Sequence, residues 1–471
     1  MPFSILLVQT NRERLPQPVI PLGLGLVAAA TAQAGHQVKV LDLCFSKDPE
    51  RELAERLRRR AYDVVGLSIR NLDSSDALRP HSYLEEVRAL VRTVRRVTPV
   101  PLIIGGAAVS IAPAAMAEYL GADHALTGAG EYALPALLKQ WGNGGPRPRR
   151  VFSGEDPPTG ASALPPAAGH TALALGRYLV RHRWLPVQTK RGCSFGCIYC
   201  TYSRIEGSVP RCRSAESVVD ELKALRSRFR VNSFELVDST WNHPVEHAKE
   251  ICEAILSAGL RPNLQSLTLH AGSCDGELLR LMVRAGFCGV GCSPDSASDR
   301  MLDQLGKGLG SDQLARTIDA VHQASLPGLW FFLLGGPGET EETVAETFRF
   351  IRKRLRRRRD IVMITCGLRI YPGTELERRA RAEGLLDASH NLLEPVFYFS
   401  PGLRRERLRE LLRQQADDRW ILMADTHLRA IEPFRRLHAL LRLRKPFWAY
   451  AGMVGRWLRS SKALGNDAAW G

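Results

Sequence analysis

The sequence predicts an α/β protein with two consecutive parallel-sheet domains and a helical C-terminal region. Two observations support this fold class. Short apolar segments alternate with amphipathic stretches from residue 3 to about 141, and a second alternating series begins near residue 185 and runs to about 385. Apolar strands that alternate with helices are typical of a parallel sheet covered on both faces. A segment rich in Gly, Pro and Ser separates the two series and is typical of a linker.

The first series predicts a doubly wound, Rossmann-like domain over residues 1–145. FSILLVQ, HQVKVLDL and DVVGLSI are expected strands, and PLGLGLVAAATAQAG is an expected helix. Sheets of this kind bind ligands in the crevice beyond the carboxyl ends of their strands. Three strand ends carry glycine-containing turns, so we predict a ligand site at this edge. Its expected residues are Pro21, Leu22, Gly23, Gly105, Gly106, Gly128 and Gly130.

The second series predicts a partial parallel (β/α)6 barrel over residues 185–385, after a linker at 146–184. Its six expected strands are LPVQTK, NSFELVDST, NLQSLTLH, GVGCSPDS, LWFFLLGG and IVMITCGLRIYP. The chemistry of such barrels sits at the C-terminal ends of the strands. Residues 386–471 are predicted to form a basic helical region.

Composition indicates a folded protein. The chain has 471 residues, of which 45% are hydrophobic and 24% charged. It has no apolar run of roughly 18 residues and no signal peptide, so we expect a cytoplasmic protein without a transmembrane segment. The formal charge of +16 could indicate nucleic acid, an anionic membrane or an acidic protein. The arginines are spread over expected helix faces, so a nucleic-acid partner is not expected.

Three of the ten cysteines stand within eight positions, as Cys193, Cys197 and Cys200. Glycines before and between them allow the loop to curl so that the three sulfurs converge. A structural zinc site would need a fourth Cys or His, and His182 and Cys212 have no familiar spacing. Three thiolates can instead hold three corners of a 4Fe-4S cluster and leave one iron open. We predict such a cluster, with a zinc site or a chance grouping as the alternatives.

This array resembles that of the radical S-adenosylmethionine (SAM) superfamily, together with the segments VDSTWN, GGPGET and RIYPGTEL. The resemblance implies that the open iron binds SAM and that Tyr199 lies beside its adenine. It also implies that the SAM pocket is shaped by Gly335, Gly336, Pro337, Gly338 and Glu339. Asp295 and Ser296 stand where relatives place polar groups for the ribose or methionine part; a turn and helix cap is the alternative.

The N-terminal region is similar to the cobalamin-binding domain of cobalamin-dependent radical SAM enzymes in its segments PLGLGL, GGAAVS and TGAGE. The last of these segments adds Glu131 to the expected cobalamin site. That branch includes C-methyltransferases of natural-product biosynthesis, such as the pyrrole methyltransferases of aminocoumarin pathways. The chain lacks the Asp-x-His-x-x-Gly segment that supplies a lower cobalt ligand in many cobalamin domains. The resemblance places Arg70 or Asn71 near that lower face, although a solvated loop residue is the alternative for Arg70.

The resemblance implies a methyltransferase that modifies an unactivated carbon of a natural-product intermediate, with SAM as methyl donor and as radical source. A small-molecule or carrier-protein-bound substrate and an external electron donor such as flavodoxin or ferredoxin are expected. Asp238, Asn242 and His243 are candidate substrate contacts and Tyr371 a candidate hydrogen relay, with ordinary packing as the alternative. A cobalamin-dependent cyclase, rearrangement or oxidation enzyme, and a non-catalytic sensor, are the alternative functions.

Overall fold

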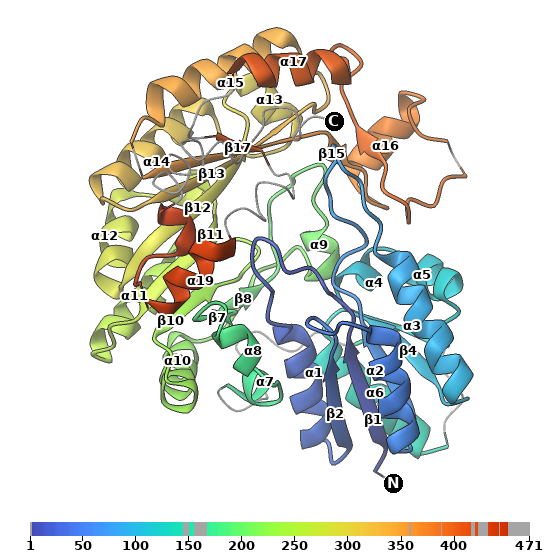
Figure 1. Ribbon diagram of the computed structural model, residues 1–471. Helices are drawn as coiled ribbons and strands as arrows, with labels where there is room; N and C mark the ends of the chain where they lie inside the picture. Colours follow the sequence, from blue (N-terminus) through green and yellow to red (C-terminus); the bar gives the residue numbers. More distant parts are fainter. Residues whose placement is uncertain are drawn as a thin grey trace.

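The computed structural model describes residues 2–144, 150–154, 167–357, 359–387, 389–415, 420–422, 432–441 and 443–450. Two α/β units lie side by side in it, each built on a parallel sheet (Figure 1). The predicted fold class is therefore confirmed. The domain boundaries stay predictions, because much of the expected linker, residues 145–149 and 155–166, falls outside the described residues.

The first unit is a six-stranded sheet in the order β2-β1-β3-β4-β5-β6, with every pair parallel. The order reverses next to β1, which creates the crevice where doubly wound sheets bind ligands. Its elements are β1 (Ser4–Gln9), α1 (Leu22–Gln33), β2 (Gln37–Asp42), α2 (Pro49–Arg59), β3 (Val64–Ser68), α3 (Leu84–Val97), β4 (Leu102–Gly105), α4 (Ala107–Ile111), α5 (Pro113–Leu120), β5 (His124–Thr127), α6 (Gly130–Gly142) and β6 (Val151–Ser153).

Local signals explain where several of these elements begin and end. Helix α2 starts at Pro49 because the Asp48 side chain accepts a hydrogen bond from the Arg51 amide, and proline suits the first helical position. Helix α5 ends at Gly121, which adopts a left-handed φ of 66°. Strand β6 was not expected, because its three residues lie within the segment interpreted as linker.

The second unit is a seven-stranded parallel sheet in the order β17-β14-β13-β12-β11-β10-β7. Six strands were expected; β17 comes from the C-terminal region and is too short to show a pattern. The elements before the fourth strand are α7 (Ala168–Thr171), α8 (Gly176–Leu179), β7 (Trp184–Val187), β8 (Lys190–Arg191), α9 (Tyr202–Ile205), β9 (Arg211–Cys212), α10 (Ala215–Phe229), β10 (Ser233–Leu236), α11 (Val245–Ser257), β11 (Asn263–Leu269), η1 (Ala271–Ser273) and α12 (Gly276–Ala285).

The rest of the chain completes the barrel and its C-terminal extension. A short antiparallel ribbon joins β15 to β16, and another joins β8 to β9. Across the described residues no helix is both long and apolar enough to cross a membrane. The remaining elements are β12 (Phe287–Asp295), α13 (Asp299–Gln304), α14 (Ser311–Gln323), β13 (Gly328–Leu334), α15 (Glu341–Arg354), β14 (Asp360–Cys366), β15 (Leu368–Arg369), α16 (Glu375–Ala382), β16 (Phe397–Tyr398), α17 (Arg405–Gln415), β17 (Trp420–Leu422), α19 (Glu432–Leu440) and η2 (Phe447–Tyr450).

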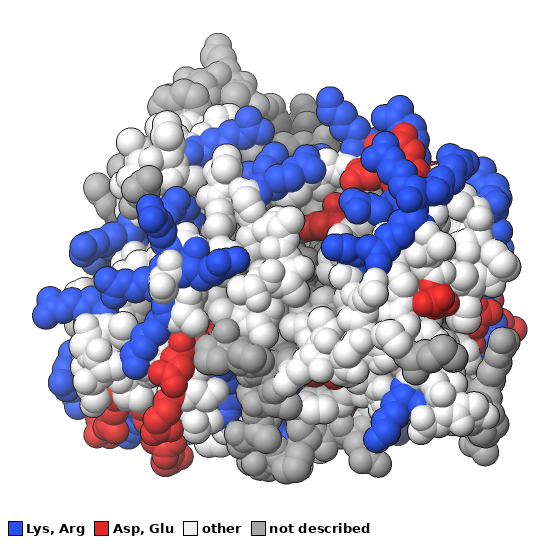
Figure 2. Space-filling model, turned by 90° about the horizontal axis from the view of Figure 1, so that it is seen from below, with Lys and Arg blue, Asp and Glu red and all other residues white. Residues whose placement is uncertain are grey.

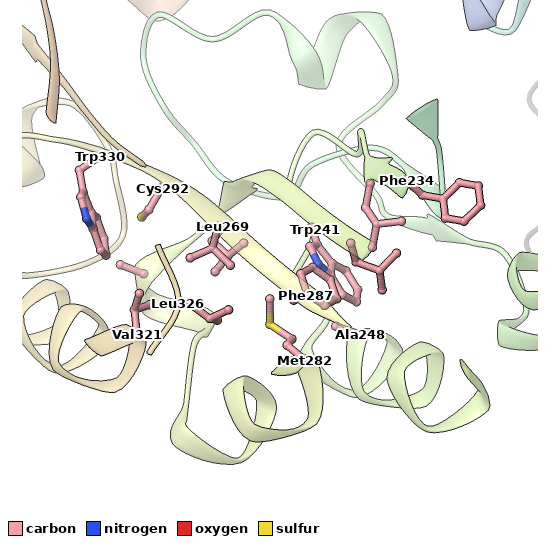
Figure 3. Close-up of a cluster of buried hydrophobic side chains, with 14 of the residues drawn as sticks. Phe234, Trp241, Ala248, Leu269, Met282, Phe287, Cys292, Val321, Leu326 and Trp330 are labelled. Atoms are coloured by element: carbon pink, nitrogen blue, oxygen red, sulfur yellow. The ribbon is translucent and has the colours of Figure 1, made fainter. Parts of the chain in front are cut away.

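A continuous hydrophobic core fills the space between the second sheet and its outer helices (Figure 3). Trp241 is completely buried and stacks on Phe287, with ring centroids 5.5 Å apart. Trp330 is also buried, and its indole nitrogen donates to Asp360. Large buried aromatic side chains contribute most to such a core, so this layer fixes the strands whose ends carry the candidate site.

The two units are joined by a buried ion pair. Arg369 on β15 donates to Asp73 of the first domain at 2.7 Å, and their side chains are 3% and 0% exposed. The same guanidinium also donates to the carbonyl oxygens of Ile370 and Leu392. The other oxygen of Asp73 accepts from the Ser75 amide at 2.9 Å. All these groups are satisfied, so the junction is fixed by hydrogen bonds in addition to packing.

Replacing Asp73 by Asn should destabilise the protein strongly, because the guanidinium of Arg369 would lose its counter-charge while staying buried. Breaking a buried pair in this way typically costs about 3–5 kcal/mol. We expect the thermal unfolding temperature to fall by about 6 °C or more. Asp303→Asn, at an exposed position on α13, is the matched control and should leave that temperature unchanged. Equal unfolding temperatures for the two variants would contradict this account of the junction.

Candidate active site between the two domains

A cavity with a volume of about 540 Å³ lies between the strand ends of the first domain and the inner face of the barrel. The first domain contributes turns that follow β3, β4 and β5, and the barrel contributes residues of β10 and β11. Eight of the predicted ligand-site residues line this cavity together with Arg70: Pro21, Leu22, Gly23, Gly105, Gly106, Gly128, Gly130 and Glu131. The structure therefore brings together almost the whole set that the sequence predicted at this edge.

Glycine is required at Gly106, which has a φ of 107°. A Cβ atom there would lie 2.5 Å from the carbonyl oxygen of Ile69, so a side chain would push β3 and β4 apart. Gly23 differs, because a Cβ atom on it would meet open space. One predicted residue lies elsewhere: Asn71 lines a separate cavity of about 360 Å³ with Arg12 and Tyr83. The direction of a loop side chain after β3 could not be read from the sequence.

The three cysteines lie on the loop between β8 and β9. Gly192 begins this loop with a φ of 93°, and a Cβ atom on it would lie 2.3 Å from the carbonyl oxygen of Val209. All three thiols are free and half-buried. Burial, and to a lesser degree charge on Cys197 and Cys193, raises the pKa of Cys200 to about 11, against the effect of a backbone hydrogen bond from Tyr202.

Zinc was the alternative to an iron-sulfur cluster at the three cysteines. A structural zinc site is almost always held by four ligands. Three cysteines instead suit a 4Fe-4S cluster in which three irons are each held by one thiolate and the fourth iron is open. The number of cysteines therefore favours the cluster over the zinc alternative.

Asp238, at the end of β10, anchors the start of this loop. Its completely buried carboxylate accepts from the backbone amides of Thr189 and Lys190, at 2.7 and 3.2 Å, and from the hydroxyl of Thr189. The Lys190 ammonium lies 3.3 Å away and is also fully buried. Asp238 was a candidate substrate contact. Its hydrogen bonds make it a positioning residue instead.

Asn242 and His243 have similar structural contacts. The Asn242 amide nitrogen donates to the carbonyl oxygens of His270 and Ser273, and its oxygen accepts from the His270 amide at 2.8 Å. His243 lies between the hydroxyls of Ser194 and Ser273, at 3.1 and 3.3 Å. Asn242 therefore ties the segment after β10 to the end of β11, and His243 ties the cysteine loop to the same region.

Tyr199, inside the cysteine array, joins a buried polar group at the end of β12. Its hydroxyl donates to Asp295, and the ammonium of Lys307 lies 2.7 Å from the same carboxylate. Burial alone would lower the pKa of Lys307, but Asp295 and Tyr199 raise it well above its ordinary range. Ser296 points elsewhere and bonds Thr347 on α15 at 3.0 Å. Sequence reasoning missed Lys307, although a lysine between two glycines, LGKGLG, was a possible signal.

Glu339 closes the turn that follows β13. One carboxylate oxygen accepts from the amides of Gly335 and Gly336, whereas the other, Oε1, is buried without a hydrogen-bond partner among the described residues. Burial raises the pKa of Glu339 to about 7, against the effects of the two amides and of the nearby Thr343 hydroxyl. An unpartnered buried carboxylate oxygen indicates that a ligand donor belongs beside it.

Tyr371 lies at the junction of the two domains. Its hydroxyl is 2.7 Å from that of Ser75, and the Arg369 guanidinium lies over its ring at 4.8 Å. These contacts connect the barrel extension with the loop after β3. The predicted relay role of Tyr371 stays a prediction.

Comparison with known families decides the class. Residues 187–351 match the model of the radical SAM superfamily, and residues 9–138 match that of the B12 binding domain. The chain is a radical SAM enzyme with an N-terminal B12-binding domain. The first match covers β7 to α15 with the cysteine loop and the Gly335 turn, and the second covers the strand ends that line the cavity.

Several relatives of this radical SAM enzyme are methyltransferases, and a cyclase of Rubrivivax gelatinosus also matches over 34% of the chain. The tryptophan 2-C-methyltransferase of Streptomyces laurentii is 25% identical over an alignment of 436 positions, which covers 77% of this chain and 72% of the relative. The cytidylyl-2-hydroxyethylphosphonate methyltransferase of Streptomyces wedmorensis is 26% identical over an alignment of 400 positions, which covers 71% of this chain and 73% of the relative. The TsrM methyltransferase from Kitasatospora setae, solved with cobalamin and a [4Fe-4S] cluster, shares the fold with a TM-score of 0.82 at 22% identity, over 99% of this chain and all of that one.

The residues of this radical SAM enzyme fit all three groups that its two domains imply. The three free thiols suit an iron-sulfur cluster. Tyr199 and the unpartnered oxygen of Glu339 suit a cofactor with an ammonium group. Glycine turns and apolar side chains around the cavity suit a large flat ligand. His182 also lines the cavity, but its Nε2 is 2.9 Å from the Pro18 carbonyl oxygen. That nitrogen therefore carries the proton and is not free to ligate a metal.

The stability of the enzyme should depend on pH through Glu339. Its folded pKa of about 7 lies above the ordinary value of 4.5, so the folded state binds the proton more tightly than the unfolded state. Stability is therefore lost as pH rises from about 4.5 to about 7, by about 3 kcal/mol. Glu339→Gln cannot ionise and should remove this loss. We expect the unfolding temperature of the variant, relative to wild type, to rise between pH 5 and pH 7.5. A pH-independent difference would show that Glu339 is not the group responsible.

Proposed function

We propose that this enzyme is a cobalamin-dependent methyltransferase that methylates an unactivated carbon of a natural-product intermediate. The observation that supports it is the shared cavity. Strand ends of the B12-binding domain line one side, and the flanks of the cysteine loop line the other through Arg191, Tyr202 and Glu206. Two cofactor-binding regions thus open on one space. The relatives that match over 70% or more of the chain are methyltransferases, which supports the reaction type.

When bound, the cluster, SAM and cobalamin supply the radical and methyl-transfer chemistry. The chain's own residues hold and orient these groups. In this proposal Cys193, Cys197 and Cys200 are the cluster ligands, whereas Tyr199, Asp295 and the Gly335–Glu339 turn bind SAM. The glycine turns of the first domain and Arg70 hold cobalamin. The apolar lining from both domains excludes water, which protects reactive species from side reactions.

We further propose a small-molecule or carrier-bound substrate, an electron donor such as flavodoxin or ferredoxin, and a cytoplasmic location. Ten free cysteines suit a reducing compartment. Nucleic acid is not part of the proposal. On the face in Figure 2, Lys and Arg gather at separate sides with a largely uncharged middle, so the net charge does not form one continuous tract there. In this proposal the basic C-terminal region, residues 386–471, binds an acidic carrier protein; part of it, including 451–471, lies outside the described residues.

Product analysis tests the proposed reaction. Reconstituted, reduced enzyme is incubated anaerobically with SAM that carries a labelled methyl group and with an extract of the producing organism. We expect S-adenosylhomocysteine, 5'-deoxyadenosine and a labelled, methylated metabolite. A cyclase or oxidising enzyme would form 5'-deoxyadenosine without S-adenosylhomocysteine, and a sensor would form neither. Cys197→Ala should hold less than about one iron in place of about four and lose all products, whereas Cys288→Ala, a half-buried thiol elsewhere, should retain both.

Cobalamin binding can be tested without disturbing the cluster. Gly23 lines the cavity and has open space at its Cβ position, so Gly23→Leu should fill part of the cavity without strain. We expect cobalamin affinity to fall by about tenfold or more, with iron content unchanged. Gly176→Leu is the matched control, since Gly176 also has open space but begins α8 outside the cavity. Equal cobalamin retention by the two variants, measured by absorbance after gel filtration, would exclude this cavity as the cobalamin site.

A further inference from the structure

A row of residues in register crosses the inner face of the barrel. Glu235 on β10 pairs with Gln265 on β11, and Gln265 pairs with Gly289 on β12. Paired residues of a parallel sheet point to the same face, so the three positions face one side. The Gln265 amide nitrogen donates to the Glu235 carboxylate at 2.9 Å. Phe234, which precedes Glu235, belongs to the hydrophobic core under the sheet, and Glu235 lines the interdomain cavity.

The C-terminal segment completes this row. The indole nitrogen of Trp448 donates to the amide oxygen of Gln265 at 3.1 Å. Gly289 leaves the room for it, because a Cβ atom there would lie 2.8 Å from the Trp448 ring and 2.9 Å from Pro446. The orientation of the Gln265 amide is therefore fixed. Its oxygen is occupied by Trp448, and its nitrogen can only face Glu235.

One oxygen of Glu235 is left for a ligand. Within the described residues, Oε2 accepts from Gln265, and no hydrogen bond or ion pair reaches Oε1. Burial raises the pKa of Glu235, against the effects of the Gln265 hydrogen bond and of the more distant Arg70 charge. Asp238, on the same cavity wall, differs because four protein donors occupy its carboxylate. Glu235 is thus a carboxylate that faces the cavity and is held in place from behind.

We propose that Glu235, oriented by Gln265 and Trp448, binds a protonated amine of the substrate. This inference rests on the proposed function, since it assumes that the substrate occupies the interdomain cavity. Glu235 is partly buried, and a carboxylate that faces a cavity with one free oxygen is stabilised by an opposite charge. An ammonium group supplies both that charge and hydrogen-bond donors. The assignment gives the substrate class: a small molecule with a basic amine within reach of the methylated carbon.

Binding measurements test this assignment without turnover. Enzyme reconstituted with its cluster and cobalamin is titrated calorimetrically at pH 7.5 with three amines of different length, from ethylamine to 2-phenylethylamine, and with the three matched alcohols. We expect at least one amine to bind about tenfold more tightly than its alcohol. Glu235→Gln should remove this preference. Trp448→Phe keeps the ring but loses the indole N–H, so it should weaken the preference because the Gln265 amide can then rotate.

Glu253→Gln, an exposed position on α11, is the matched control and should behave as wild type. Circular dichroism and iron content establish that each variant is folded. An absent amine preference in wild type, or one that survives in Glu235→Gln, would overturn the assignment. Formation of S-adenosylhomocysteine is scored separately. Methylation without any amine preference removes only this inference, whereas an amine preference without methyl transfer removes the proposed reaction and keeps the amine site.

Discussion

The position of the cysteine loop depends on one buried interaction, between the Asp238 carboxylate and the first residues of the loop. Thr189 and Lys190 leave the barrel wall there, and all of their donors that face Asp238 are used. The Lys190 ammonium also donates to the Trp241 carbonyl oxygen at 2.6 Å. Because an unpaired buried charge costs several kcal/mol, neither residue can move without losing its partners. The rigid sheet therefore determines where the loop begins.

A second polar group holds the same loop from the opposite side. Tyr199 reaches Asp295, which is itself paired with Lys307. Asp295 has a φ of 68°, a left-handed conformation that is unfavourable for aspartate and persists only when its surroundings fix it. The ion pair supplies that constraint. The loop is thus held at β10 and at β12, and a site supported by strands on both sides is more precise than one carried by a free loop.

The sequence predicted what depends on local patterns and missed what depends on distant contacts. The cavity glycines were found because strand-end turns have a local signal, and the cysteines were found by their spacing. Asp238 was interpreted as a substrate contact because its partners lie 48 and 49 residues away, so nothing nearby showed that its oxygens are occupied. Lys307 was missed because its role depends on a contact with Tyr199, which lies 108 residues earlier in the chain. The three residues of β17 gave no pattern.

Four buried or cavity-facing carboxylates at the barrel strand ends differ in how completely the protein satisfies them. Asp238 and Asp295 are each paired with a buried lysine. Glu339 and Glu235 each have one oxygen that accepts from the protein and a second oxygen without a hydrogen-bond partner in the described part of the chain; that of Glu339 is buried, whereas Glu235 is partly exposed to the cavity. Folded proteins rarely leave a buried oxygen such as that of Glu339 unpaired, because an unpaired buried polar group costs free energy. Asp238 and Asp295 therefore hold the cysteine loop in place, and the other two carboxylates mark where bound molecules add partners, Glu339 beside the cofactor turn and Glu235 toward the shared cavity.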